Sequence, residues 1–200
     1  FVPFDDLDAV KAVIRPNTRM LYTEVASNPT DRLCDIETLA GIAHDAGALL
    51  MVDNTFTTPF CIKPLTLGAD IVINSLTKFL NGHSDALAGS ITVKDMALYE
   101  QIHTVRMLTG TSGCPFASWM IFRGIHTAGL RIKTQCENAA KLALALDQNP
   151  HVKTVNHPAV PSHPQHDLAE KLFSSPYLAT GMSSFEMPND RAKINAFMDR

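Results

Sequence analysis

The chain lacks the features that mark membrane proteins and nucleic-acid-binding proteins. No apolar run approaches the ~20 residues that a membrane-spanning helix needs. Its 17 Lys and Arg residues are outweighed by 20 Asp and Glu, which gives a formal net charge of −3, and no run of Lys and Arg is longer than two residues. Because nucleic-acid binders concentrate positive charge, we expect neither a nucleic acid nor a membrane as a partner.

Cysteine is also sparse, and its spacing excludes two further classes. The four cysteines are Cys34, Cys61, Cys114 and Cys136. They form no CxxC pair and no regular framework, so we predict no disulfide scaffold and no metal site. Reduced thiols are typical of a cytoplasmic protein, which is the location we expect. The chain begins without Met and without a signal-peptide pattern. We expect it to be an internal piece of a longer protein.

Helical and extended patterns alternate through the first half of the chain. Helical periodicity covers residues 5–14 and 35–46, and apolar extended runs cover 19–25, 48–52, 69–73 and 89–93. Short strand–helix–strand connections predict an α/β fold with a mainly parallel sheet flanked by helices. The uninterrupted apolar run at 48–52 predicts a strand that is covered on both faces.

The second half changes character. Helical periodicity dominates from residue 94 to about 148, and two further strand candidates, at 152–157 and 181–187, follow it. We therefore predict two partial domains, residues 1–130 and a smaller α+β region at 131–200. Trp119 and Phe122 lie at helical spacing and are interpreted as core residues. His163 and His166 are interpreted as solvated histidines rather than metal ligands.

Polar side chains collect where the predicted strands end. Ligands of parallel sheets bind at the carboxyl ends of the strands, so we expect these side chains to converge on one edge of the sheet. They are Glu24 and Asn28 at the first strand, Asp53 and Thr55 at the second, and Ser75, Thr77 and Lys78 at the third.

This set matches the needs of a pyridoxal phosphate site. Such a site needs a lysine for the cofactor aldehyde, a carboxylate for the ring nitrogen, and hydroxyls or amides for the phosphate. Lys78 and Asp53 could supply the first two, and Ser75 and Thr77 are short hydroxyl donors. Each residue alone has a plainer interpretation. Lys78 could be a solvated loop residue, Asp53 a turn cap, and the two hydroxyls ordinary strand-end groups.

Three ordered segments add a family resemblance. They are residues 24–29 (EVASNP), 52–56 (VDNTF) and 75–85 (SLTKFLNGHSD). Together they resemble the Cys/Met-metabolism, or transsulfuration, family of pyridoxal-phosphate enzymes. The resemblance continues through 123–127, 137–139, 162–166 and 184–186, and so covers nearly the whole chain. It implies a fold-type I enzyme with pyridoxal 5'-phosphate as its cofactor. Its substrates would be sulfur amino acids such as cystathionine and methionine, or O-acylhomoserine.

The resemblance also assigns a role to each strand-end residue. It implies that Lys78 holds the cofactor aldehyde and acts as the general base, and that Asp53 pairs with the ring nitrogen beside Thr55. Ser75 and Thr77 would bind the phosphate. Asn28 would lie near the phenolic oxygen of the ring, with Glu24 behind it. One departure is Ala26, where family members often have proline. We interpret His83 and Asp85 as residues that structure their loop.

Several questions stay open at this stage. The resemblance implies a homo-oligomer, a dimer of dimers (homotetramer) in the full-length protein. It does not separate β- from γ-elimination, nor a lyase from a synthase or a sulfhydrylase. One alternative is an inactive family member that serves as an oligomeric or binding subunit. Another is a different fold-type I pyridoxal-phosphate enzyme, such as an aminotransferase or a decarboxylase.

Overall fold

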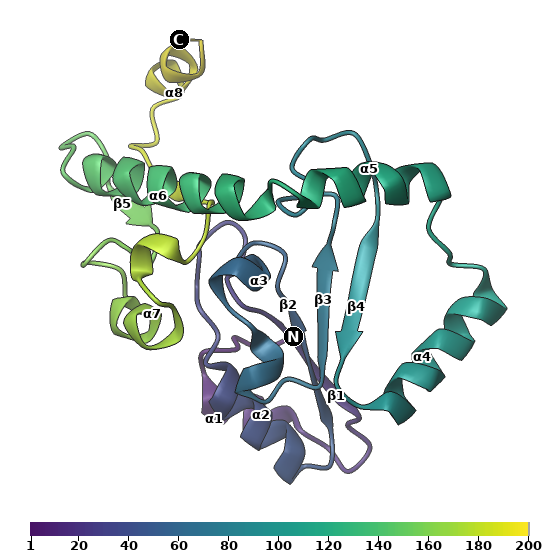
Figure 1. Cartoon of the computed structure of the whole chain (residues 1–200). Helices are drawn as coiled ribbons and strands as arrows, with labels where there is room; N and C mark the ends of the chain where they lie inside the picture. The colour runs from purple at the N-terminus through teal and green to yellow at the C-terminus, as the bar shows by residue number, and fades with distance from the viewer. Residues whose placement is uncertain (200) are drawn as a thin grey trace.

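A four-stranded sheet forms the centre of the computed structural model, which describes residues 1–199 (Figure 1). Its strands are β1 (Met20–Glu24), β2 (Leu49–Asp53), β3 (Ile71–Ser75) and β4 (Gly89–Val93), in that spatial order. β1, β2 and β3 are parallel, whereas β4 runs antiparallel to β3. The prediction of an α/β fold with a mainly parallel sheet is therefore confirmed.

Short helices connect the strands. α1 (Leu7–Val13) precedes β1, and α2 (Ile36–Asp45) connects β1 to β2. Asp35 caps α2, because its side chain accepts a hydrogen bond from the Thr38 amide. α3 (Thr58–Cys61) and the 3-10 turn η1 (Pro64–Leu67) lead from β2 to β3.

The main core lies between the sheet and α1 and α2. Its fully buried members include Leu50 and Val52 of β2 and Ile36 of α2. Along β2 these buried residues alternate with half-buried ones. One face of β2 is thus fully buried and the other is half-buried, so the strand is covered completely on one face and in part on the other. The other face of the sheet has exposed side chains at Met20, Tyr22 and Ile91.

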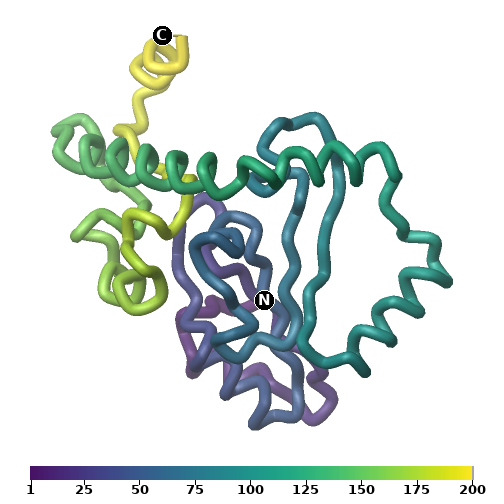
Figure 2. The backbone as a smooth tube through the Cα atoms, in the orientation of Figure 1, coloured from purple at the N-terminus to yellow at the C-terminus, as the bar shows by residue number. Residues whose placement is uncertain are grey.

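Three helices follow the sheet: α4 (Met96–Thr109), α5 (Pro115–Ile125) and α6 (Ala128–Asp147). α4 stands apart, and α5 and α6 then run end to end over the carboxyl end of β3 (Figure 2). The core prediction for Trp119 and Phe122 is wrong, since they are 53% and 65% exposed. α5 buries Ile121 and Gly124 instead, because Gly124 lies against the Asn81 main chain.

The last part of the chain contains β5 (Thr154–Asn156), α7 (His166–Leu172), the 3-10 turn η2 (Pro176–Leu178), β6 (Ser184–Glu186) and α8 (Arg191–Met198). β5 and η2 pack against α6, whereas α8 stands away from it (Figure 1). β5 and β6 form an antiparallel pair. The predicted boundary after residue 130 falls in the first turn of α6, and this division stays a prediction. His163 is 6% exposed, so its interpretation as a solvated residue is wrong.

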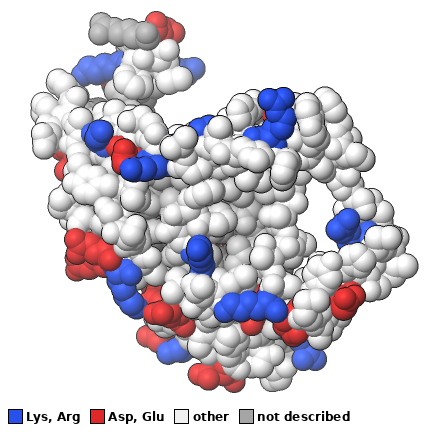
Figure 3. Space-filling model, in the orientation of Figure 1, with Lys and Arg blue, Asp and Glu red and all other residues white. Residues whose placement is uncertain are grey.

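Lys and Arg are interspersed with Asp and Glu on the surface visible in Figure 3, and they gather mainly over the lower part of the view. Further Lys and Arg, with fewer Asp and Glu, lie on the upper part of this view. Among residues 1–199, no helix combines the length and hydropathy required to cross a bilayer.

Candidate functional site

The carboxyl ends of β1, β2 and β3 bring the predicted site residues to one edge of the sheet. Glu24 and Asp53 are register partners on adjacent parallel strands. The Asn54 amide donates to the Ile73 carbonyl over 2.9 Å, which ties the end of β2 to β3. The sheet register therefore aligns two carboxylates next to the strand that leads to Lys78.

A chain of hydrogen bonds links Asp53 to the end of β3. The Thr55 amide donates to Asp53 Oδ1 over 2.9 Å. The Thr55 hydroxyl in turn accepts from the Ser75 amide over 2.8 Å. Thr55 is 8% exposed, so the hydroxyl that joins the two strand ends is largely shielded from water. Asp53, Thr55 and Ser75 therefore form one connected unit.

Lys78 lies in a tight turn that begins directly after β3. Its amide donates to the Ser75 carbonyl over 3.2 Å, and the Gly82 amide donates to the Lys78 carbonyl over 2.7 Å. The Lys78 side chain is exposed and makes no ion pair with any residue between 1 and 199. The turn thus fixes the lysine backbone and leaves its amine available.

Arg131 of α6 holds this turn from outside the sheet. Its Nη1 donates to the Phe79 carbonyl over 2.9 Å, and its Nη2 donates to the Leu80 carbonyl over 3.0 Å and to the Gly124 carbonyl over 2.8 Å. Sequence reasoning missed this residue. An arginine in the first turn of a helix carries no signal that it contacts main chain about fifty positions upstream.

Thr77 joins the lysine turn to the start of β4. Its hydroxyl accepts from the Ala88 amide over 3.1 Å and donates to the Ala88 carbonyl over 3.4 Å. The donated bond is the longer of the two. A phosphate oxygen near Thr77 could therefore take over that proton while the bond from the amide persists.

The edge of the sheet is negatively charged. Burial raises the pKa of Glu24, the Asn28 amide opposes this, and the charge of Asp53 raises the pKa further. Tyr22, which the sequence did not single out, donates from its hydroxyl to Asp53 Oδ2 over 3.3 Å. Burial and the nearby Asp53 carboxylate raise the pKa of Tyr22 to about 12.

These charges fit the predicted cofactor. Neither Glu24 nor Asp53 forms an ion pair within the described part of the chain. Two adjacent carboxylates without a cation favour a positively charged partner. A protonated pyridine ring supplies that charge at one nitrogen, and the exposed Lys78 amine supplies the nucleophile for an aldehyde.

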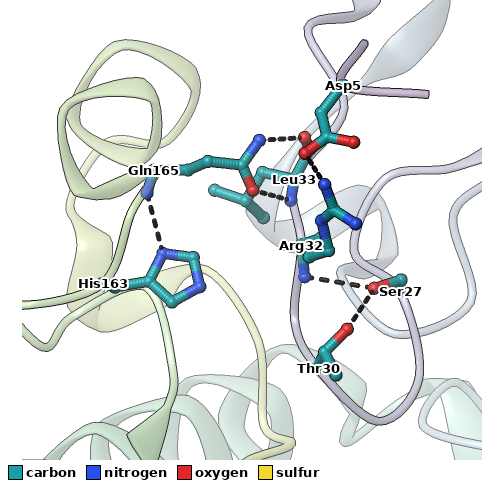
Figure 4. Close-up of polar contacts among 7 residues, drawn as sticks. All are labelled: Asp5, Ser27, Thr30, Arg32, Leu33, His163 and Gln165. Atoms are coloured by element: carbon teal, nitrogen blue, oxygen red, sulfur yellow. Dashed lines mark hydrogen bonds and ion pairs between the residues drawn. The ribbon is translucent and has the colours of Figure 1, made fainter. Parts of the chain in front are cut away.

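Asn28 lies on a loop after β1 that is closed by its own hydrogen bonds. The Ser27 amide donates to the Arg32 carbonyl over 2.9 Å, and the Ser27 hydroxyl lies 3.1 Å from the Thr30 hydroxyl. Asn28 itself is exposed and precedes a cis peptide bond to Pro29. Figure 4 shows Gln165 approaching the same loop from the C-terminal part of the chain.

The loop after Lys78 is organised by its own polar residues. The His83 ring donates from Nδ1 to the Asn81 carbonyl over 2.6 Å. Asp85 Oδ1 accepts from the Asn81 side-chain amide over 2.7 Å. The prediction that His83 and Asp85 structure this loop is confirmed.

Comparison with known proteins gives consistent results. The chain is 41% identical over 198 residues to a cystathionine gamma-lyase of Bacillus subtilis, with 99% of this chain and 51% of that protein covered. It is 40% identical over 201 residues to a cystathionine beta-lyase of Coxiella burnetii, with 100% of this chain and 51% of that protein covered. The chain therefore spans about half the length of these curated relatives.

A solved structure agrees with this. The crystal structure of cystathionine gamma-lyase from Lactobacillus plantarum complexed with L-serine matches with a TM-score of 0.90 and 36% identity. The match covers 94% of this chain and 49% of that one. The family model described as Cys/Met metabolism PLP-dependent enzyme matches residues 1–200. The strand-end carboxylates, the lysine turn and these matches place the chain in one group: it belongs to the Cys/Met metabolism family of PLP-dependent enzymes.

Proposed function

We propose that the full-length protein is a pyridoxal-phosphate enzyme that eliminates or replaces the β- or γ-substituent of a small amino acid. The proposed substrates are cystathionine, methionine or O-acylhomoserine. The observation that carries this proposal is the pair of carboxylates Glu24 and Asp53, which lie side by side in the register of β1 and β2 and form no ion pair among residues 1–199. Asp53 is in addition hydrogen-bonded through Thr55 to the strand that ends at the Lys78 turn.

Each residue has a defined task in this proposal. The cofactor, when bound, supplies an aldehyde and a ring that accepts negative charge from the substrate. Lys78 would hold the cofactor at its aldehyde through Nζ, and its free amine would serve as the base that takes the proton from the substrate Cα. Asp53 holds a proton at the ring nitrogen. A carboxylate there favours the protonated ring, because an opposite charge at short range stabilises the charged form.

The remaining residues position the cofactor. The hydroxyls of Ser75 and Thr77 donate to the phosphate, which fits their place directly before Lys78. Thr55, held between Asp53 and the Ser75 amide, would contact the ring. The Asn28 side chain would bind the phenolic oxygen, and Glu24, whose pKa the Asn28 amide lowers, would support Asn28.

We also propose a homo-oligomer, a dimer of dimers, in the cytoplasm. Exposed apolar side chains on α4 and α5 support the assembly, since Leu108 is 82% exposed and Phe116 and Phe122 are each 65% exposed. Large apolar side chains exposed in this way are typical of surfaces that contact a partner. The four free cysteines support a reducing compartment.

Absorbance spectroscopy of the full-length protein tests the cofactor assignment. Titration with pyridoxal phosphate should produce a visible band in the wild type that is absent from Lys78→Ala. The matched control is Lys94→Ala, which removes an exposed lysine that lies just after β4, and it should keep the band. A wild-type protein without the band would contradict the proposal and favour the inactive subunit.

Product analysis then identifies the reaction. β-Elimination of cystathionine gives homocysteine, pyruvate and ammonia, whereas γ-elimination gives cysteine, 2-oxobutyrate and ammonia. O-acylhomoserine with sulfide gives homocysteine and the released acid if the protein catalyses replacement. A protein that binds the cofactor and only transaminates or decarboxylates these substrates would refute the proposed reaction class.

A further inference from the structure

Two cysteines that the proposed reaction does not use lie in contact. The Sγ atoms of Cys61 and Cys136 are 3.8 Å apart, although 75 positions separate the two residues in the sequence. Cys61 ends α3, and Cys136 lies in the middle of α6. Both thiols are free. The contact joins the segment that follows Asp53 to the helix that carries Arg131.

The two thiols differ in access and in acidity. Cys136 is 1% exposed and packs with Leu80, Ala128 and Ile132, whereas Cys61 is only partly buried. The hydrogen bond from Cys136 lowers the pKa of the Cys61 thiol, and burial opposes this. The same hydrogen bond and burial raise the pKa of Cys136. Because the thiolate is the reactive form, Cys61 is the sulfur that an oxidant attacks first.

We propose that Cys61 and Cys136 form a reversible oxidation site that closes to a disulfide and switches the cofactor site. With hydrogen peroxide as the oxidant, the Cys61 thiolate attacks one peroxide oxygen and the O–O bond breaks. The released hydroxide takes up a proton, which leaves a sulfenic acid and one water. The Cys136 sulfur then attacks the Cys61 sulfur, the S–O bond breaks, and the Cys136 proton leaves with hydroxide as a second water.

Each cysteine lies in a segment whose hydrogen bonds hold one side of the site: Cys61 on the side of Asp53, and Cys136 on the side of Lys78. On one side, the Asn54 side chain, next to Asp53, donates to the Ile62 carbonyl over 3.1 Å, directly after Cys61. On the other side, Arg131 precedes Cys136 by about one turn of α6 and holds the carbonyls that follow Lys78. Closing the gap from 3.8 Å to a bond of about 2.05 Å pulls α3 towards α6.

This movement shifts the Asp53 end of the site against the Lys78 end. A misplacement of about 1 Å in an active site can cost ~100-fold in rate, so we expect a loss of that order in turnover upon oxidation. The effect on turnover rests on the proposed function, whereas formation of the disulfide does not.

Peroxide treatment of the full-length protein tests the site. Free thiols are counted, the Cys61–Cys136 peptide is mapped by mass spectrometry, and turnover is followed before and after dithiothreitol. We expect the wild type to lose two thiols and about 100-fold in turnover, both restored by the reductant. Cys61→Ser and Cys136→Ala should keep their turnover in peroxide. Cys114→Ser, which removes the exposed thiol directly before α5, should lose turnover in peroxide as the wild type does.

Three results would overturn the proposal. They are the absence of the cross-linked peptide after peroxide, a cross-linked protein with unchanged turnover, and equal inactivation of Cys61→Ser and the wild type. Peptide mapping needs only the wild-type protein, so it decides the disulfide even if a variant fails to fold. It also needs no turnover, so failure of the proposed function would be recognised separately.

Discussion

Gln165 pairs with the main chain of Leu33 in the manner of a neighbouring strand. Its Oε1 accepts from the Leu33 amide and its Nε2 donates to the Leu33 carbonyl, each over 2.7 Å (Figure 4). The two residues are 132 positions apart in the sequence. This pair fixes the loop that carries Asn28 against the C-terminal part of the chain.

Substitution of Gln165 should therefore destabilise the fold. Gln165→Ala leaves the amide and the carbonyl of Leu33 without partners, and each unpaired buried group costs about 1–3 kcal/mol. We expect the free energy of unfolding to fall by roughly 2–3 kcal/mol in denaturant titrations. Gln165→Glu retains the acceptor and loses only the donor, so it should fall between alanine and the wild type. Equal stability of all three proteins would contradict the role of this pair.

Substitution of Gly82 tests whether Arg131 positions the turn that carries Lys78, and Gly47 is the matched control. Gly82 adopts φ +73, and a Cβ at this position would collide with the Arg131 guanidinium. Gly47 adopts φ +67 with nothing within 4 Å of its Cβ position. Both alanine variants meet the left-handed backbone penalty of roughly 1–2 kcal/mol. Only Gly82→Ala should also displace Arg131 from the turn that carries Lys78.

We expect Gly82→Ala to lose at least about 10-fold in turnover at cofactor saturation, since even small misplacements of a reacting group are costly. Gly47→Ala should lose stability without a comparable loss of turnover. Thermal unfolding and steady-state kinetics on the full-length proteins separate the two effects. Similar kinetics for both variants would argue against Arg131 as a positioning residue for Lys78.

Asp31 should make the stability depend on pH. Its side chain is fully buried, and its carboxylate oxygens have no hydrogen-bond partner among the described residues. Burial raises the pKa of Asp31 to about 8 from its ordinary value of 3.8. Between these values the folded state keeps a proton that the unfolded state has released, so stability falls as the pH rises. The contribution is complete below pH 3.8 and is lost as the pH rises to about 8.

Asp31→Asn removes this titration and keeps the shape of the side chain. Asparagine also tolerates the positive φ of 48 at this position. Relative to the variant, the wild type should lose up to about 1.4 kcal/mol of unfolding free energy per pH unit across the window. Urea titrations at a series of pH values measure the difference. If the free energy of unfolding depends on pH in the same way in both proteins, the Asp31 carboxyl is not buried in its protonated form.

Substitution of Asp53 should lower kcat far more than substitution of Tyr22, although the two side chains share a hydrogen bond. Asp53→Asn removes the charge that the proposed function places at the ring nitrogen, and lost electrostatic stabilisation of this kind costs about 100-fold or more in kcat. Tyr22→Phe removes only one 3.3 Å hydrogen bond to the carboxylate, so its loss of kcat should stay below about 10-fold. Steady-state kinetics at saturating cofactor compare them. An Asp53→Asn enzyme with near-normal kcat would contradict the assigned role.

Local signals explain why much of the fold could be predicted from the sequence. Apolar runs that end in polar residues marked β1, β2 and β3, and β4 has the predicted bounds of Gly89–Val93. The errors concern burial. Trp119 and Phe122 keep helical spacing but lie on the exposed side of α5. Periodicity identifies a helical stripe, and only tertiary packing decides which stripe is covered.

The candidate site shows the same limit. Glu24, Asp53 and Ser75 could be grouped from the sequence, because the carboxyl ends of parallel strands meet at one edge. Arg131 and Gln165 could not, since their hydrogen bonds go to main-chain groups of distant segments. Every residue type carries these main-chain groups, so the sequence at the contacted position does not indicate the bond. Sequence reasoning therefore identified the residues assigned to the chemistry and missed those that hold their backbone in place.

Helix α6 has a mechanical consequence. Its 20 residues make it about 30 Å long. Arg131, in its first turn, holds the carbonyls after Lys78, and Ala143, in its last turn, packs with Val155 of β5. A continuous helix with contacts at both ends links the two regions, so the position of the lysine turn depends on the packing of β5 against α6 as well as on the sheet.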